Sequence, residues 1–148
     1  MSPLPAILTS AYRVVLLALL TWREARGETR GARVQVAWTV RNRVENPKWW
    51  GTDYISVITK KWQYSSIASP RDPQLILYPQ ENDHVFLECL EIANTVISSS
   101  SGEEIAPFPE ADSYYDDSIA PPAWATPDKM VGRIGRLAFY NIDGSSQD

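Results

Sequence analysis

The sequence predicts a mainly α-helical α+β domain that ends in a small antiparallel β-ribbon. Apolar residues recur at helical spacing in several stretches before residue 98, which favours helices over that part of the chain. Beyond residue 110, two short aromatic segments replace this spacing, at residues 113–115 and 132–140. Such segments, bounded by glycine and proline, are typical of paired strands, so we expect them to form the ribbon.

The first helix contains the longest apolar run of the chain. Residues 14–20 are all apolar and lead directly into Trp22, Arg23 and Glu24. A run without a polar face is typical of a helix that is buried on all sides. We expect this helix to begin at Ser10, a candidate N-cap, and to stop at Gly27, so that Glu24 emerges from the core in the last turn.

Glu24 is the first candidate for chemistry. A carboxylate at the end of a buried helix loses part of its hydration, which raises its pKa toward the range where it can donate a proton at neutral pH. The alternative for Glu24 is a solvated charge paired with Arg23 or Arg26. Glu28 would share a face with Glu24 only if the helix continued past Gly27. An ion pair or a helix cap is therefore the favoured role of Glu28.

Three further helices are expected, each with a start or stop signal. The second runs from Gly27 to Val44 and is ended by Asn46 and Pro47. A short third helix is capped by Thr52 or Asp53. An apolar stripe between residues 85 and 97 indicates a longer one, capped by Asn82 or Asp83.

The remaining segments are irregular. Residues 62–80 contain three prolines and few periodic positions, and a long loop of this kind is usually functional or mobile. We expect one domain over residues 1–142 and a disordered tail over residues 143–148.

Composition and charge exclude several function classes. The chain has 148 residues, of which 44% are hydrophobic and 22% charged, which is typical of one folded globular domain. A net charge of -4 provides no basic footprint for nucleic acid. With one cysteine (Cys89) and one histidine (His84), the chain has no internal disulfide and no His/Cys zinc site, so we predict no metal and no cofactor.

Neither a membrane span nor a signal peptide is predicted. The apolar run over residues 14–20 is too short to cross a bilayer, and no small-residue cleavage site follows it. We therefore expect no stable membrane insertion.

Aromatic residues are enriched, with six Trp and seven Tyr. Aromatic rings on loops suit flat, weakly polar ligands such as sugar rings. Trp49 and Trp50 fall in a predicted turn, where they either stack on sugar or form a packed turn.

Five short segments, in this order along the chain, resemble the SleB/CwlJ-type cell-wall hydrolase family. Residues 22–28 read Trp-Arg-Glu-Ala-Arg-Gly-Glu, and residues 36–44 read Val-Ala-Trp-Thr-Val-Arg-Asn-Arg-Val. Gln-Tyr-Ser at 63–65 resembles the Gln-Phe-Ser of the family. Ala-Asp-Ser-Tyr-Tyr at 111–115 resembles an aromatic strand of its phage members, and Ile-Gly with Phe-Tyr within 134–140 resembles its closing strand.

The resemblance implies a lysozyme-like domain with a buried catalytic helix that cleaves the glycan strands of peptidoglycan. The first glutamate of the family's Glu-Ala-Arg-Gly-Glu segment is the catalytic acid, which corresponds to Glu24 here. Glu28 is then a possible second carboxylate. The closing motif of the family usually has a histidine two residues after the glycine, and this chain has Leu137 there.

The same interpretation assigns other residues to a substrate cleft. Gln63, Tyr64 and Ser65 would line it, with Gln63 binding an acetamido group or a sugar hydroxyl, whereas the alternative is a loop that caps a helix. Neighbouring residues of a strand point to opposite faces, and we assign Tyr114 to the cleft. Asp112 is a further candidate for substrate binding.

Glycosidic cleavage requires an acid that protonates the leaving oxygen. In a lytic transglycosylase the muramic 6-hydroxyl then attacks, and one glutamate can act first as acid and later as base. The resemblance implies this route. If Glu28 or Asp112 faces Glu24, hydrolysis by water becomes possible.

Two alternatives come from other classes: a non-catalytic peptidoglycan-binding module of the same fold, and a structural protein of a phage particle. An amidase fits poorly because no set of zinc ligands is present. We expect a monomer whose partner is the peptidoglycan glycan strand. As a phage-like lysis enzyme, it would be made in the host cytoplasm and act on the wall after release, or be carried in a phage particle.

Overall fold

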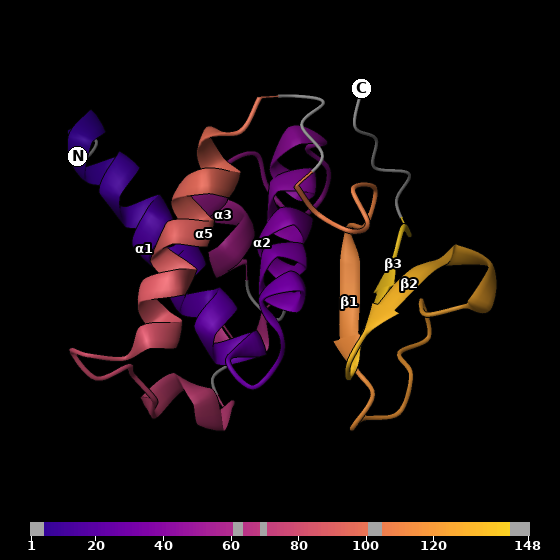
Figure 1. The fold of residues 1–148 in the computed structure, drawn as a ribbon. Coiled ribbons are helices and arrows are strands. Elements are labelled where there is room, and N and C mark those ends of the chain that lie inside the picture. Colours follow the sequence, from indigo (N-terminus) through magenta and orange to yellow (C-terminus); the bar gives the residue numbers. More distant parts are fainter. Residues whose placement is uncertain (1–4, 61–63, 69–70, 101–104, 143–148) are drawn as a thin grey trace.

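A computed structural model of the chain describes residues 5–60, 64–68, 71–100 and 105–142. It places a bundle of helices beside a small sheet (Figure 1). The α-helices are α1 (Ala6–Ala25), α2 (Arg30–Glu45), α3 (Tyr54–Thr59), α4 (Ser65–Ala68) and α5 (His84–Ser98). The short helices η1 (Pro73–Ile76) and η2 (Pro127–Lys129) and the strands β1 (Ser113–Asp116), β2 (Met130–Ile134) and β3 (Leu137–Tyr140) complete the described part. The tail predicted over residues 143–148 lies outside it.

The first helix begins earlier than predicted. Pro5, not Ser10, is the N-cap of α1, and its carbonyl accepts hydrogen bonds from the amides of Leu8 and Thr9. Proline suits this place because its fixed φ angle matches the helix entry. Burial starts only at Leu17, and Tyr12 is 55% exposed. The expectation of a helix buried on all sides is therefore wrong for its first half.

Because it starts earlier, α1 is longer than the sequence predicted. At 20 residues, α1 is long and apolar enough to span a membrane by length and composition. Core helices and signal sequences meet the same criterion, and the second half of α1 is core in this structure.

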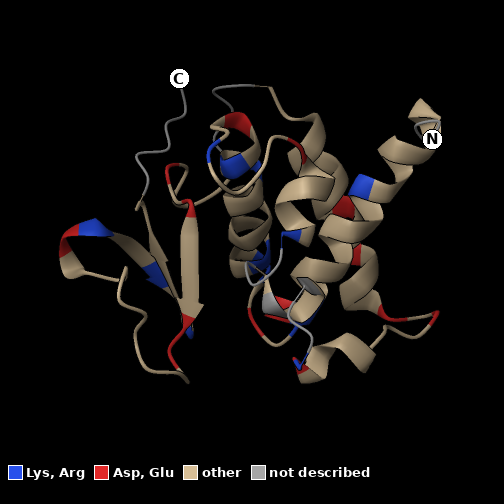
Figure 2. Ribbon diagram, turned by 180° about the vertical axis from the view of Figure 1, so that it is seen from behind, with Lys and Arg blue, Asp and Glu red and all other residues tan. Residues whose placement is uncertain are grey.

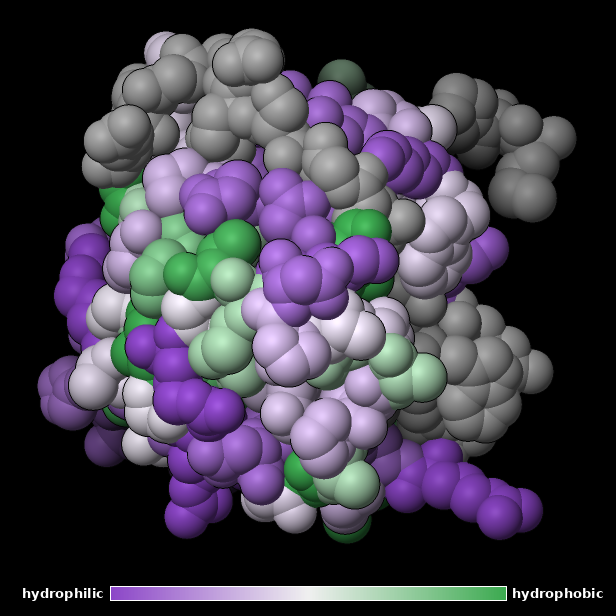
Figure 3. All heavy atoms as spheres, turned by 90° about the vertical axis from the view of Figure 1, so that its right-hand side faces the viewer, coloured by the Kyte–Doolittle hydropathy of each residue, from purple (hydrophilic) through white to green (hydrophobic). Residues whose placement is uncertain are grey.

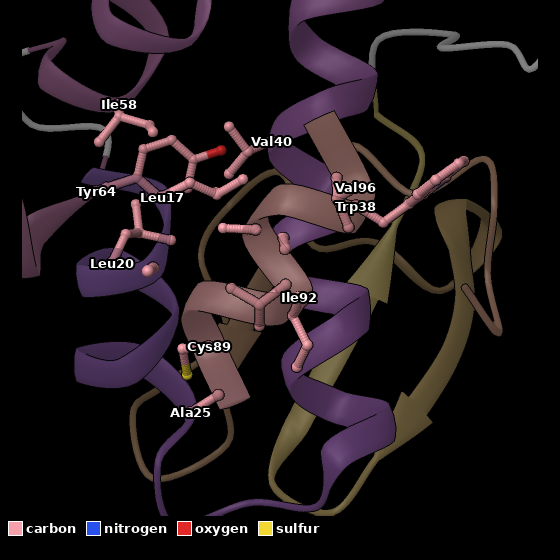
Figure 4. Close-up of a cluster of buried hydrophobic side chains, with 14 of the residues drawn as sticks. Leu17, Leu20, Ala25, Trp38, Val40, Ile58, Tyr64, Cys89, Ile92 and Val96 are labelled. Carbon is pink, nitrogen blue, oxygen red and sulfur yellow. The ribbon is translucent and has the colours of Figure 1, made fainter. Parts of the chain in front are cut away.

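The hydrophobic core lies where α1, α2 and α5 pack together. Its largest fully buried side chains include Trp38, Leu17 and Ile92, one from each of these helices. Figure 4 shows this cluster, with Cys89 of α5 inside it and Tyr64 entering from one side. Burial raises the pKa of the Cys89 thiol to about 12, as expected of an inert core cysteine.

The predicted caps of α3 and α5 are those in the structure: Asp53 caps α3 in a capping box with Ser56, and Asp83 caps α5. Thr29 caps α2, a role that was not predicted from the sequence. Each side-chain oxygen accepts an amide N–H that the first helical turn leaves unpaired.

One face of α2 holds the segment that leads into the sheet. Gln35 donates to the carbonyl of Phe108 and accepts from its amide, at 3.0 and 2.7 Å. Trp38 and Asn42 donate to the carbonyl of Pro109. Positions 35, 38 and 42 share one helix face. A row of polar side chains thereby fixes the sheet against the helices.

The sheet has the strand order β1-β3-β2, and both pairs are antiparallel. The predicted ribbon is the pairing of β1 with β3, in which Tyr114 faces Phe139. The segment expected as one strand over residues 132–140 is instead a hairpin. Gly135 and Arg136 form the two-residue turn between β2 and β3. Gly135 has a φ of +56°, as tight hairpin turns of this kind require.

Charged residues are spread over helices, loops and strands in the described part of the chain (Figure 2). The side of the molecule formed by the sheet is mostly hydrophilic, with hydrophobic residues in small separate patches (Figure 3).

Candidate active site

A cavity of about 840 Å³ lies between the C-terminal end of α1, the region around η1, and β1. All four residues of β1 line it, so the cavity runs along that strand. The other lining residues are Arg23, Glu24, Arg43, Trp49, Tyr64, Asp72, Pro73, Gln74, Ser118, Ile119, Pro122, Trp124, Leu137 and Ile142.

Glu24 sits in the last turn of α1 and reaches this cavity. The Tyr114 hydroxyl donates a hydrogen bond of 3.0 Å to its Oε1. Burial is the largest influence and raises the pKa of the Glu24 carboxyl group from 4.5 to about 7. The negative charges of Asp72 and Asp116 raise this pKa further, whereas the Tyr114 hydrogen bond lowers it. Glu24 can therefore give up and take back a proton near neutral pH.

The alternative role of Glu24, an ion pair with a neighbouring arginine, is not what the structure shows. Arg23 donates to the carbonyls of Ser66 and Leu77, and Arg26 donates to the Gln74 side chain at 2.8 Å. Among the described residues, no ion pair involves Glu24. The two guanidinium groups instead bind the irregular segment to the end of α1.

Tyr114 and Tyr64 form the wall beside Glu24. Their ring centroids are 6.4 Å apart, and the guanidinium of Arg43 lies 5.4 Å from the Tyr64 ring. Burial raises the pKa of both tyrosine hydroxyls, so both remain protonated at neutral pH. Tyr114 therefore acts on Glu24 only as a hydrogen-bond donor.

Two buried hydroxyl groups near Glu24, those of Tyr64 and Ser66, have no hydrogen-bond partner among the residues that the structure describes. The Ser66 hydroxyl nevertheless lowers the pKa of Glu24, though less than Tyr114 does.

The other predicted site residues lie in different places. Gln63 falls outside the described residues, and Ser65 is described only as the first residue of α4. Asp112 is completely buried, accepts hydrogen bonds from Ser113 Oγ and from the amide of Ile142, and does not line the cavity. The structure therefore does not bring Asp112 to Glu24.

Glu28 does not line the cavity either. Its Oε1 accepts a hydrogen bond of 2.9 Å from the amide of Arg136, in the turn between β2 and β3. The carboxylate thus ties the α1–α2 connection to the sheet. This contact is neither the ion pair nor the helix cap that the sequence favoured, because the hairpin that supplies the amide was not predicted.

Sequence reasoning missed two carboxylates in the cavity, Asp72 and Asp116. Asp116 lies two residues after Tyr114 on β1, so both point to the same face of the strand. That spacing could have identified Asp116. Asp72 caps η1 through its hydrogen bond with the amide of Gln74, in a segment without any periodic pattern. Leu137, at the position of the family's histidine, is buried in the cavity wall.

Comparisons with known proteins give a family and a fold. The sequence profile of the family described as cell wall hydrolases matches residues 27–140. Proteins with curated functions give no match. Two solved structures are similar to this chain, the catalytic domain of the germination-specific lytic transglycosylase SleB from Bacillus anthracis and the catalytic domain of the Bacillus cereus SleB protein.

The first has a TM-score of 0.64 and 21% sequence identity, and the match covers 86% of this chain and 93% of that one. The second has a TM-score of 0.62 and 23% identity, covering 86% and 88%. At this identity the likeness shows the fold, which confirms the predicted lysozyme-like α+β domain. The profile match begins at Gly27, just after Glu24, and spans most of the chain. This protein belongs to the SleB/CwlJ-type cell wall hydrolase family.

Proposed function

We propose that this protein cleaves the glycosidic bond between N-acetylmuramic acid and N-acetylglucosamine in peptidoglycan, as a lytic transglycosylase that uses Glu24. The observation that carries the proposal is a glutamate with a pKa of about 7 at the wall of a large cavity. Membership of the cell wall hydrolase family supports the substrate. The similar structure from Bacillus anthracis, which is described as a lytic transglycosylase, supports the reaction type.

The proposed reaction begins with protonated Glu24, which donates its proton to the glycosidic oxygen as the bond between that oxygen and C1 of muramic acid breaks. The departing sugar leaves as a free hydroxyl, and positive charge develops at C1. The Glu24 carboxylate then takes the proton of the muramic 6-hydroxyl, whose oxygen attacks C1 and forms a 1,6-anhydro ring. Glu24 is protonated again, and no water is consumed.

Tyr114 keeps Glu24 available in both forms. Its hydrogen bond stabilises the carboxylate that is left after the first step, against the cost of burying that charge. Because burial is the larger influence, the carboxyl group remains a competent acid near neutral pH.

Hydrolysis is a second candidate because Asp72 and Asp116 line the same cavity. Each accepts one backbone N–H, from Gln74 and Ser118 respectively. Either carboxylate could accept a proton from a water molecule that attacks C1 in place of the 6-hydroxyl. Hydrolysis would leave a reducing end in place of the anhydro ring.

Digestion of purified peptidoglycan by the wild type and by Glu24→Gln tests the proposal, with the products read by mass spectrometry. We expect anhydro-muropeptides from the wild type and at least a thousandfold less product from the variant, roughly the scale of losing acid–base catalysis. Reducing-end products that disappear in Asp72→Asn or Asp116→Asn would establish the hydrolase instead. Binding to peptidoglycan without cleavage by either protein would favour the non-catalytic module.

We further propose that the protein is a lysis enzyme of a phage or prophage that reaches the wall after release from the host cytoplasm. The aromatic segment at residues 111–115, which resembles phage members of the family, supports this setting. Expression in bacteria should cause lysis only after the membrane is permeabilised, and not with Glu24→Gln.

A further inference from the structure

Trp49 is one of the cavity-wall residues that the proposed chemistry does not use. It is 53% exposed, whereas Tyr64, Tyr114, Tyr115 and Trp124 are buried or half-buried where they line the cavity. The exposed face of a tryptophan ring is apolar and poorly hydrated. Such a face is suited to stack on another flat, weakly polar ring.

The turn that carries Trp49 is fixed at several points. Lys48 and Gly51 form a β-bridge, and Gly51 adopts φ +128°, which favours glycine. Trp50 is fully buried and donates a hydrogen bond of 2.8 Å to the carbonyl of Arg43. The Trp49 ring lies 5.4 Å from the Trp50 ring, centroid to centroid, at an interplanar angle of 57°. The backbone that carries Trp49 is therefore already ordered before a ligand covers the ring.

Contacts link this turn to the start of β1. The Arg43 guanidinium lies 4.8 Å from the Trp50 ring and donates to Ser113 Oγ, at the start of β1. Glu24 meets Tyr114 further along the strand, and Asp116 ends it. The turn is therefore linked through Arg43 to the first residue of β1, whereas Glu24 contacts the second, and both Trp49 and Glu24 line the cavity.

We infer that Trp49 is a stacking platform for a second pyranose ring of the glycan strand, apart from the ring at which the bond breaks. This inference rests on the proposed function. A glycan strand that contacts both Trp49 and Glu24 is held at two points. The affinity for the strand is therefore higher, while the rate of the chemical step at Glu24 is unchanged. The expected effect of losing the ring is thus a higher KM with little change in kcat.

The test compares the wild type, Trp49→Ala, Trp49→Phe and Tyr12→Ala on glycan strands freed of peptides. Tyr12 is a matched control, because it is 55% exposed and does not line the cavity. We expect Trp49→Ala to raise KM about tenfold, which corresponds to the loss of one good aromatic contact, and to leave kcat within about twofold. Trp49→Phe should recover most of the affinity, and Tyr12→Ala should match the wild type.

An unchanged KM for Trp49→Ala on strands that the wild type cleaves would overturn the inference and leave the proposed function intact. If the wild type cleaves nothing, the proposed function is wrong. The role of Trp49 is then tested by measuring the binding of glycan strands. Strand binding by Glu24→Gln that weakens about tenfold in Glu24→Gln/Trp49→Ala would support the platform. Equal binding by both proteins, or binding by neither, would overturn it.

Discussion

At the scale of single residues, the pKa of Glu24 is set by opposing influences. Burial at the end of α1 disfavours the charged form, and the Tyr114 hydrogen bond favours it, with a resulting pKa of about 7. The charges of Asp72 and Asp116 add to the effect of burial, so the acid is tuned by the irregular segment and the sheet as well as by its own helix.

Replacing Tyr114 by Phe should move the pH profile of the reaction. Protonated Glu24 is the acid, so kcat/KM of the wild type should fall as the pH rises through about 7. Tyr114→Phe removes a donor that lowers this pKa, so the pKa rises and the falling limb moves about one unit to higher pH. Measurement of kcat/KM between pH 5 and about 9 checks this shift.

Tyr12→Phe serves as the control for that experiment, since Tyr12 is exposed on α1 and outside the cavity. Its falling limb should coincide with that of the wild type. A limb that stays in place or moves to lower pH in Tyr114→Phe would contradict the proposed effect of the hydrogen bond on Glu24.

At the scale of elements, Glu28 joins the α1–α2 connection to the hairpin of β2 and β3. Its carboxylate accepts the amide of Arg136, and it lies against Gly135, where a Cβ atom would meet its Oε1. A larger residue at position 135 would push the carboxylate away. The hairpin belongs to the sheet that carries Tyr114, so this contact helps to place Tyr114 against Glu24.

Two variants of Glu28 separate this role from that of a second catalytic carboxylate. Glu28→Gln keeps an oxygen that can accept from Arg136, so we expect its peptidoglycan cleavage to remain within about threefold of the wild type. Glu28→Ala removes this hydrogen bond and should lower the free energy of unfolding by about 0.5–1.5 kcal/mol, measured by urea denaturation. A loss of cleavage in Glu28→Gln comparable with that of Glu24→Gln would show a catalytic carboxylate instead.

The elements that the sequence predicted well have local signals. Asp53 and Asp83 begin helices with their own side chains, so neighbouring residues suffice to find them. The start of α1 was misplaced because Pro5 begins it through backbone geometry alone. Asp72 was not identified because its position at the cavity depends on how distant segments pack.

At the scale of the whole molecule, α2 connects the two halves of the site. Its residues Gln35 to Arg43 are all buried, although several are polar. Four of these side chains, those of Gln35, Trp38, Asn42 and Arg43, bind backbone groups of the segment before β1. Glu24 comes from the helical bundle and Tyr114 from the sheet, so their 3.0 Å contact depends on this attachment.

Replacing Gln35 by Ala should therefore weaken the whole structure and the site together. The variant leaves both the amide and the carbonyl of Phe108 without the partner they have now, which should cost about 2–4 kcal/mol of unfolding free energy. Under conditions where the variant is still folded, its cleavage of peptidoglycan should also fall, because the sheet is less firmly held.

Gln80→Ala, at an exposed position, is the control and should change neither the free energy of unfolding nor the cleavage of peptidoglycan. Urea denaturation and an activity assay on the same samples check both effects. A change below about 0.5 kcal/mol in Gln35→Ala would mean that the sheet is held by contacts other than this face of α2.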